Sequence, residues 1–594
     1  MGDRKIGGLD GRQLTVREAG PYNTPFPNPL IPAMSALIEC VPNFSEGRNP
    51  EIIRQITDRI VAAGGVTLLH VDRGFDTNRT VVTVAGPPEA VLEAAFQGIQ
   101  AAAALIDMRR HTGAHPRMGA TDVCPLVPIS GITLEETARH ARALAERVGG
   151  ELSIPVYLYE AAQPDPARKN LATIRAGEYE GLSEKMRRPE WRPDFGPLEF
   201  QPHCGATVIG ARDFLVAYNV NLNTTSTRRA TAVAFDVREA GRPRREGDPR
   251  TGKIIRDAAG RPVSIPGSLK AVKAIGWYIA EYGIAQVSMN LTDLTVTPLH
   301  VAFDEVCRKA EARGLRVTGS ELVGLVPLAT MLEAGRHFLR KQHRSAGVSE
   351  QELIRIATKS LGLDELAPFK PEERIIEYRL RAGGESALAN MSLAGFIGET
   401  ASESVAPGGG SVAAAVGALG AALGTMVANL SAHKRGWDER WEEFSKWAER
   451  GQALKDELLR LVDADTQAFN QVMAALALPR GSEAEQAARG TALDRANRGA
   501  IETPLQVMRT AAAAFDLLEA MASSGNPASA SDAGVGALCA RAAVRGAWLN
   551  VRTNLAGVSD PAFGVRLTEE GLRLTQSAEA REAKVLGIVE GKIG

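Results

Sequence analysis

Residues 87–129 decide the fold of the first half of the chain, and they read PPEAVLEAAFQGIQAAAALIDMRRHTGAHPRMGATDVCPLVPI. Apolar side chains recur every three or four positions over 87–110, which predicts an amphipathic helix. The apolar run at 123–129 predicts a strand. The loop between them, His111–Ala120, holds two histidines and an arginine among glycines. Because titratable loop residues are common in catalysis, we expect a functional site in this loop.

Strand and helix patterns alternate on either side of this loop. The first unit has predicted strands at 38–43, 66–72, 80–84 and 156–159, and predicted helices at 50–63 and 87–110. A second unit has predicted strands at 213–222 and 284–290, and predicted helices at 226–237 and 298–313. This βαββαβ-type alternation predicts two α+β, ferredoxin-like subdomains with helices on one face of each sheet. The polar segment 240–268 is predicted to be a solvated loop or hairpin.

The pattern changes class after residues 381–387, a Gly-containing stretch that we interpret as a linker. Predicted helices then follow one another at 390–402, 410–432, 438–476, 482–524, 530–555 and 560–590. Long helices with short breaks predict an all-α helical bundle. We therefore divide the chain into a flexible N-terminal extension (1–37), two α+β subdomains (38–214 and 215–380), the linker (381–387) and a helical domain (388–594).

Composition argues against several classes of function. The 594 residues include 69 basic and 70 acidic side chains, a balance that does not favour nucleic acid as a partner. The five cysteines form no CxxC pair, which favours reduced thiols in a cytoplasmic protein over a disulfide framework or a zinc site. Residues 404–432 carry no charge but are mostly Ala and Gly. A helix buried by close contacts in a soluble bundle is therefore favoured over a membrane span.

His115 is the first candidate catalytic residue. It precedes Pro116, which keeps its backbone out of the helical region, and it adjoins Arg117. A histidine in this position fits a general base with an anion-binding neighbour, or a residue that caps the preceding helix. His111, at the predicted helix end, fits the capping role better. Asp72 ends a predicted strand, where its carboxylate either orients a histidine across a cleft or forms an Asx turn.

Asp465 is the strongest local anomaly in the helical part. Steps of three and four residues place it on the apolar stripe of a predicted helix, together with Leu454, Leu458, Leu461, Val462, Phe469 and Val472. Asp463, two residues earlier, points elsewhere. A carboxylate on the inward face is costly unless it is hydrogen-bonded or functional, and the pattern leaves both alternatives open.

Glycines and amides give further candidates. The segment 406–411 lacks the lysine of a phosphate loop, but the free N–H groups of Gly408, Gly409 and Gly410 can receive a carbonyl or carboxylate. A tight turn between helices explains the same glycines. Asn526 lies at a predicted helix start, where helix capping is a sufficient explanation for the neighbouring polar residues. Asn550 lies one turn from Asn554, and such a pair of amides can hold the edge of a planar heterocycle.

Eleven short segments occur in a characteristic order: 39–47 (ECVPNFSEG), 77–80 (TNRT), 115–120 (HPRMGA), 122–125 (DVCP), 174–180 (IRAGEYE), 194–197 (DFGP), 276–278 (GWY), 324–327 (GLVP), 373–378 (ERIIEY), 406–411 (APGGGS) and 462–465 (VDAD). In this ordered set the chain resembles the formiminotransferase-cyclodeaminase family, bifunctional folate enzymes of histidine degradation. The resemblance implies two α+β subdomains that form the formiminotransferase half, with folate in the cleft between them. It also implies an all-helical cyclodeaminase half.

The first implied reaction transfers the formimino group of N-formimino-L-glutamate to N5 of tetrahydrofolate. The family's catalytic histidine corresponds to His115, and Asp72 would orient it. Charge alone makes Arg79, Arg117 and Arg175 candidates for the substrate carboxylates. The family's folate segment corresponds to residues 196–205, with His203-Cys204 in place of Ser-Trp. It keeps Gly196, Pro197, Phe200, Pro202 and Gly205.

The second implied reaction closes 5-formimino-tetrahydrofolate to 5,10-methenyl-tetrahydrofolate and releases ammonia. The family's acid–base residue corresponds to Asp465, and the glycines at 408–410, Asn526 and Asn550 are the candidate folate contacts beside it. The resemblance implies tetrahydrofolate as co-substrate, no metal, and a homo-oligomer. Two alternatives are a helical half that acts as a methenyltetrahydrofolate cyclohydrolase, and a folate-binding oligomer without turnover.

Overall fold

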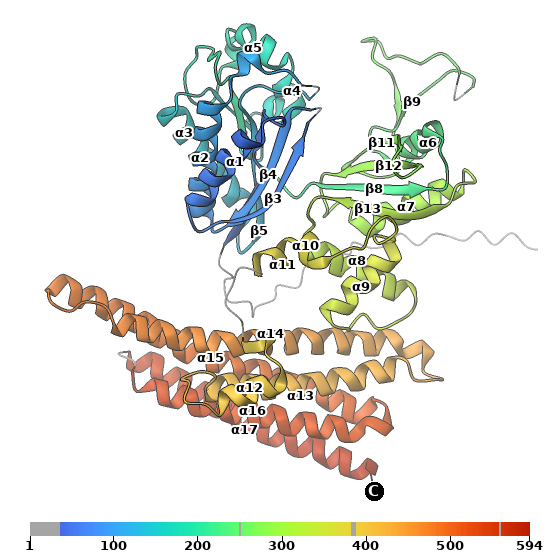
Figure 1. The fold of residues 1–594 in the computed structure, drawn as a ribbon. Helices are drawn as coiled ribbons and strands as arrows, with labels where there is room; N and C mark the ends of the chain where they lie inside the picture. Colours follow the sequence, from blue (N-terminus) through green and yellow to red (C-terminus); the bar gives the residue numbers. More distant parts are fainter. Residues whose placement is uncertain are drawn as a thin grey trace, which may run out of the picture.

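The computed structural model describes residues 36–75, 77–113, 115–248, 251–381, 388–557 and 560–593. Two α/β units and a layer of long helices follow one another along the chain (Figure 1). The predicted N-terminal extension (1–37) and linker (381–387) lie almost entirely outside the described residues. Both units have the ferredoxin-like order of elements, so the predicted fold class is confirmed.

The first subdomain is a seven-stranded sheet with the order β1-β4-β2-β5-β7-β6, and β3 pairs with β4 at its edge. Its βαββαβ core consists of β1 (Leu37–Cys40), β2 (Asn43–Phe44), α1 (Pro50–Ala62), β3 (Thr67–Gly74), β4 (Arg79–Gly86), α2 (Pro88–Leu105) and β5 (Thr121–Ser130). After α3 (Leu134–Glu151), β6 (Val156–Glu160) and β7 (Thr207–Ala211) extend the sheet in parallel with β5. Between β6 and β7 lie α4 (Leu171–Arg175) and α5 (Glu178–Met186). Helices α1, α2 and α3 cover one face, where the apolar core lies (Figure 1).

Helix α2 ends five residues earlier than the sequence predicts. Ile106, its C-cap, is extended (φ −104°, ψ 118°), and the side chain of Asp107 caps a separate 3₁₀ turn, Met108–Arg110. Because the Asp107 side chain accepts a hydrogen bond from the N–H of Arg109, it begins a new turn and does not continue α2. His111 therefore follows this 3₁₀ turn and not the long helix.

The second subdomain has a four-stranded antiparallel sheet with the order β11-β12-β8-β13. Its elements are β8 (Val216–Leu222), α6 (Thr227–Val237), β11 (Val272–Ile279), β12 (Ile284–Leu291), α7 (Leu299–Glu311) and β13 (Val317–Val323). The segment 240–268 forms a small hairpin from β9 (Arg242–Pro243) and β10 (Ser264–Ile265), as predicted. The chain continues through α8 (Leu328–Lys341), α9 (Glu350–Leu361), α10 (Pro371–Arg374) and α11 (Ile376–Arg381).

The helical domain contains α12 (Leu393–Thr400), α13 (Gly409–Ala432), α14 (Trp441–Leu476), α15 (Glu483–Ser524), α16 (Ala530–Leu555) and α17 (Pro561–Ile593). Among the described helices, α13 alone is long and apolar enough to cross a membrane by length and composition. It packs on α14, α15 and α16 through small residues. A Cβ on Gly420 would lie 2.8 Å from the Gly536 carbonyl oxygen, and one on Gly424 would lie 2.9 Å from Leu517. These close contacts agree with the predicted buried bundle helix.

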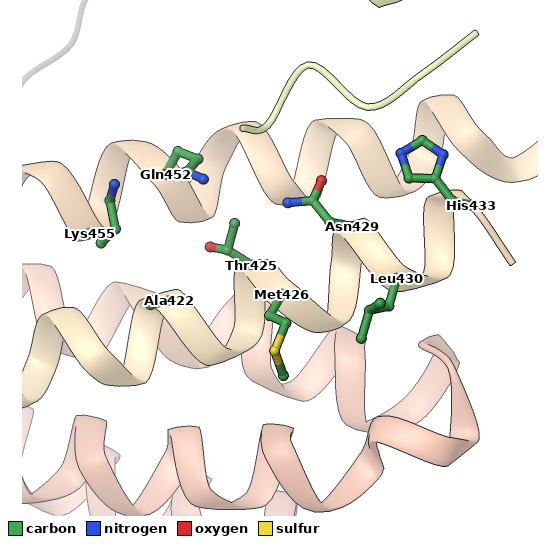
Figure 2. A pocket seen from close by; sticks show the side chains of 8 residues that line it. All are labelled: Ala422, Thr425, Met426, Asn429, Leu430, His433, Gln452 and Lys455. Atoms are coloured by element: carbon green, nitrogen blue, oxygen red, sulfur yellow. The ribbon is translucent and has the colours of Figure 1, made fainter. Parts of the chain in front are cut away.

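The loop between α8 and α9 joins the second subdomain to the bundle. Asn429 of α13 donates to the Gly347 carbonyl at 2.7 Å, and Gln452 of α14 donates to the same oxygen at 3.2 Å. A Cβ on Gly347 would lie 2.3 Å from Cβ of Ala448, so only glycine fits this approach. A pocket of about 490 Å³ lies beside this contact. Figure 2 shows its lining, with Thr425, Met426 and Asn429 on α13 and Gln452 and Lys455 on α14.

Two candidate active sites

The His115 loop is held by backbone contacts from three neighbouring segments. Ser45 Oγ donates to the Gly119 carbonyl at 2.7 Å, and Tyr179 N donates to the Arg117 carbonyl at 2.8 Å. Ala120 N donates to the Cys204 carbonyl at 2.8 Å. A Cβ on Gly119 would lie 2.3 Å from the Ala206 carbonyl oxygen, so the loop packs directly against the start of β7. These contacts fix the backbone around a half-buried imidazole.

The two histidines of the loop have different hydrogen-bond partners. His111 Nδ1 accepts from Arg117 Nε at 3.2 Å, which leaves a hydrogen on Nε2 to donate to the Asn78 carbonyl at 2.9 Å. His115 Nδ1 lies 2.6 Å from the Pro116 carbonyl oxygen, an acceptor that requires a hydrogen on Nδ1. The Nε2 lone pair of His115 is then available as a base. His111 is therefore structural, but it joins the loop to Asn78 and does not cap α2 as predicted, because α2 ends at Leu105.

Positive charge surrounds the His115 imidazole. Arg79 Nη1 lies 3.2 Å from His115 Nδ1, and Arg79 and Arg175 both bind the carboxylate of Asp122. Burial, Arg79 and Arg175 together lower the pKa of His115, against the opposing effects of the Pro116 carbonyl and Asp122. A lowered pKa keeps the imidazole neutral near pH 7, the state in which it accepts a proton.

The structure does not bring Asp72 to His115. Strand β3 continues to Gly74, so Asp72 pairs with Val81 inside an edge strand, and its side chain is exposed. Among the residues that the structure describes, no hydrogen bond or ion pair joins Asp72 to His115. The side chains around His115 are instead Arg79, Arg175 and Asp122. The predicted orienting role of Asp72 is therefore corrected, because Asp72 extends toward solvent from the sheet edge.

The predicted role of the three arginines also changes. Arg117 is 7% exposed and binds the carboxylates of Glu178 and Glu180, so its charge is already compensated. Arg79 and Arg175 share the single carboxylate of Asp122. Two cations on one anion leave one net positive charge beside His115. These two arginines can still attract a substrate carboxylate, whereas Arg117 holds the loop to α5.

The predicted folate segment, 196–205, adjoins the His115 loop. Gly205 (φ 69°) hydrogen-bonds to the Gln201 carbonyl, and its Cβ position lies 2.2 Å from the Met118 carbonyl oxygen. Gly196 (φ 84°) packs equally closely on Ile154. Phe200 contacts Tyr179 with ring centroids 5.4 Å apart, and the Pro202 carbonyl accepts from the Tyr179 hydroxyl. Pro197 is half-buried in the same segment. Positive φ and close backbone contacts therefore explain why positions 196 and 205 are glycine.

A second site lies in the helical domain, in a pocket of about 380 Å³. Its lining comes from the residues that precede α13 and from α13, α14, α15 and α16, and it includes Gly408, Gly409, Asp465, Asn497, Asn550 and Asn554. Asp465 accepts a hydrogen bond from Ser411 N at 2.9 Å and another from Ser411 Oγ at 3.2 Å. Burial raises the pKa of Asp465, and the two bonds from Ser411 oppose this effect. A partly buried carboxyl with a raised pKa in a polar pocket is suited to acid–base chemistry.

The candidate folate contacts of the helical domain separate into two groups. Gly410 lies against Asp465, since its Cβ position is 2.2 Å from Asp465 Oδ1, and Gly409 approaches the Asn550 amide. Asn526 lies elsewhere: its N–H donates to Ser431 at the other end of α13, and its side chain caps Pro527–Ser529. Asn526 is therefore a structural cap, and its predicted folate contact is corrected. Asp463 accepts from Leu388 N at 2.6 Å and points away from the pocket, as predicted.

Two candidate acid–base groups, His115 and Asp465, thus lie on two different folds, an arrangement that fits a bifunctional enzyme. Residues 37–212 match the formiminotransferase domain, N-terminal subdomain; residues 217–381 match the formiminotransferase domain; and residues 392–571 match the formiminotransferase-cyclodeaminase model. The chain belongs to the formiminotransferase-cyclodeaminase family. It carries both activities, formimidoyl transfer and cyclodeamination, which excludes an oligomer without turnover.

Curated relatives cover the whole protein and each half. Formimidoyltransferase-cyclodeaminase of Sus scrofa is 43% identical over 94% of this chain and 100% of its own length. Glutamate formimidoyltransferase of Streptococcus pyogenes is 39% identical over a region that covers 52% of this chain and 94% of the relative's own length. Methenyltetrahydrofolate cyclohydrolase of Methylorubrum extorquens is 35% identical and corresponds to 34% of this chain and 98% of its own.

Proposed function

We propose that His115 moves the proton in the transfer of the formimino group from N-formimino-L-glutamate to tetrahydrofolate. N5 of tetrahydrofolate attacks the formimino carbon, and Nε2 of His115 takes the N5 proton. The bond between this carbon and the glutamate nitrogen then breaks, and the same proton passes to the departing nitrogen. The observation that carries this proposal is the bond from Nδ1 to the Pro116 carbonyl, which leaves Nε2 as the basic nitrogen.

We assign the ring closure to Asp465. N10 of 5-formimino-tetrahydrofolate attacks the formimino carbon, the bond from this carbon to the terminal nitrogen breaks, and ammonia leaves. Ammonia gains one proton from N10 and one from the acid form of Asp465. The product is the methenyl cation, which the resulting carboxylate stabilises. The raised pKa of Asp465 supports this role, because it keeps the acid form accessible closer to neutral pH.

A cyclohydrolase-type reaction of the helical half, in addition to cyclodeamination, is the second candidate, and the Methylorubrum relative favours it. The same bundle would then also add water to the methenyl group and produce a formyl product. The identity of 43% with a bifunctional relative over both halves favours ammonia release as the main reaction. Ammonia from 5-formimino-tetrahydrofolate and formyl product from the methenyl compound are separate measurements that distinguish the two reactions.

We also propose that the protein is a homo-oligomer of the cytoplasm whose reactions use tetrahydrofolate and no metal. A stripe of large apolar side chains on α13 supports self-association: Leu419 is 58% exposed, Met426 39% and Leu430 46%. Val535, Leu538 and Leu549 add exposed apolar side chains on α16. Five cysteines without a disulfide are consistent with a reducing compartment. His115 and Asp465 supply acid–base groups for both steps.

The test is a coupled assay of the full chain with N-formimino-L-glutamate and tetrahydrofolate, following methenyl absorbance and ammonia together. His115→Ala should abolish transfer but leave ring closure of supplied 5-formimino-tetrahydrofolate at the wild-type rate. Asp465→Asn should let 5-formimino-tetrahydrofolate accumulate. Loss of both activities in folded His115→Ala protein would contradict two separate sites, and unchanged ammonia release in Asp465→Asn would remove Asp465 from the mechanism.

A further inference from the structure

Asp122 has the most fully satisfied carboxylate near the transferase site, although the mechanism above does not use it. Asp122 is the second residue of β5, and its side chain is 0% exposed. In sequence it lies 43 residues from Arg79 and 53 residues from Arg175. One oxygen binds a guanidinium nitrogen of each arginine. The other accepts from Arg175 Nε at 3.2 Å and from Met118 N at 3.1 Å.

Arg79 is the link between this carboxylate and the imidazole. Its Nε and Nη2 both donate to Asn43 Oδ1, at 3.1 and 2.8 Å, so the planar group is fixed from two sides. Its Nη1 binds Asp122 and lies 3.2 Å from His115 Nδ1. Because Nδ1 already donates to Pro116, this second approach is a charge beside the ring and not a second bond to it.

We infer that Asp122 is a positioning residue of the formimino transfer: it holds Arg79 against His115, binds Arg175 nearby, and so sets the charge that this imidazole experiences. This inference rests on the proposed role of His115. The clamp joins β4, α4 and the His115 loop, since Arg79, Arg175 and Met118 belong to those three segments. It compensates one of two cations and leaves one net positive charge, which keeps the imidazole neutral and available as a base.

The inference predicts opposite effects for two substitutions. Asp122→Asn removes the only negative charge of the clamp and leaves two cations, so the acid limb of the transferase pH profile should move to lower pH. Arg79→Gln removes the cation nearest to His115 and leaves a neutral Asp122–Arg175 pair, so the same limb should move to higher pH. Near pH 7, kcat of Asp122→Asn should fall on the order of 10-fold to 100-fold through loss of positioning.

Asp194→Asn is the matched control. Asp194 also accepts from an arginine, Arg168 at 2.9 Å, and from a backbone N–H, Leu158 at 2.8 Å, in the same subdomain. Its substitution should lower Tm and leave the acid limb at the wild-type position. Ammonia release from supplied 5-formimino-tetrahydrofolate should be unchanged in every variant, which shows that the helical site is intact.

The experiment measures kcat and kcat/KM of transfer against pH for the full-length wild type and the three variants. Opposite displacements of the acid limb in Asp122→Asn and Arg79→Gln support the inference. An acid limb that stays at the wild-type pH in Arg79→Gln overturns it, whether or not Asp122→Asn folds. Transfer at the wild-type rate in folded His115→Ala protein would instead refute the proposed function, so the two failures are distinguishable.

Discussion

Gly410→Ala should slow ring closure about 100-fold in a protein that still folds. The Cβ of alanine would lie 2.2 Å from Asp465 Oδ1 and 2.5 Å from its Cγ, whereas ordinary contact begins at 3.4 Å. Either the carboxylate or the first turn of α13 must therefore move by about 1 Å. A displacement of about 1 Å at a reacting group costs about 100-fold in rate, or about 2.7 kcal/mol of transition-state stabilisation.

The stability change has two opposing parts. Overpacking costs about 1–3 kcal/mol, and replacing glycine by alanine in a helix returns about 0.5–1 kcal/mol. The net loss is roughly 0–2.5 kcal/mol, which leaves a domain of this size folded. Gly587→Ala in α17 is the control, because its Cβ position has no neighbour within 4 Å. That variant should gain up to about 1 kcal/mol and keep full activity.

The assay supplies 5-formimino-tetrahydrofolate and follows ammonia and methenyl absorbance, with thermal unfolding measured on the same protein. Folded Gly410→Ala should release ammonia about 100 times more slowly than the wild type and Gly587→Ala. Transfer at the His115 site should be unaffected. Wild-type ammonia release in Gly410→Ala would refute the placement of Asp465 against Gly410, or its role in ring closure.

Two further predictions concern groups outside the proton-transfer steps. Burial, opposed by Arg212 and assisted by Glu377, raises the pKa of Glu39 from 4.5 to about 7. Protonated Glu39 therefore makes its full contribution to the free energy of unfolding below pH 4.5, and this contribution is lost as the pH rises through about 7. Thermal unfolding should therefore show Glu39→Gln more stable than the wild type above pH 7, by up to about 3 kcal/mol, and similar to it at pH 4.5; equal Tm values at pH 8 would contradict this. Asn550→Ala should slow ammonia release, whereas Asn526→Ala should only lower stability by about 1 kcal/mol, as expected for a lost cap; the opposite pattern would place the folate contact at Asn526.

The elements that could be predicted from sequence are those in which regularly spaced apolar side chains mark the buried face. Helices α13 to α17 agree with the predicted ranges to within about three residues, because long apolar stripes are strong signals. Asp465 could be found in the same way, as a carboxylate inside such a stripe. Strands β11 and β13 were missed. Lys273, Gly276 and the exposed Trp277 interrupt the apolar pattern of β11, since one face of that sheet is open to solvent.

Asp122 shows why the rest could not be predicted. It stands in the apolar run TDVCPLV, where a single carboxylate reads as a strand boundary, and nothing local indicates two arginines. Its partners come from β4 and α4, which only the folded sheet brings together. For Asp72 the sequence predicts a function that the structure does not support. A carboxylate at the end of an apolar strand is a reasonable candidate, but only the folded sheet shows that β3 is an edge strand.

The two histidines of the loop show how one backbone gives the same side chain different functions. His111 accepts from Arg117 and donates to a carbonyl, so both ring nitrogens are used and its pKa is lowered without any basic nitrogen left over. His115 donates through Nδ1 and has Arg79 beside it, so its pKa is also lowered but Nε2 keeps a lone pair. The direction of the pKa shift is the same for both. The availability of a nitrogen, set by which partner occupies Nδ1, therefore distinguishes the base from the structural residue.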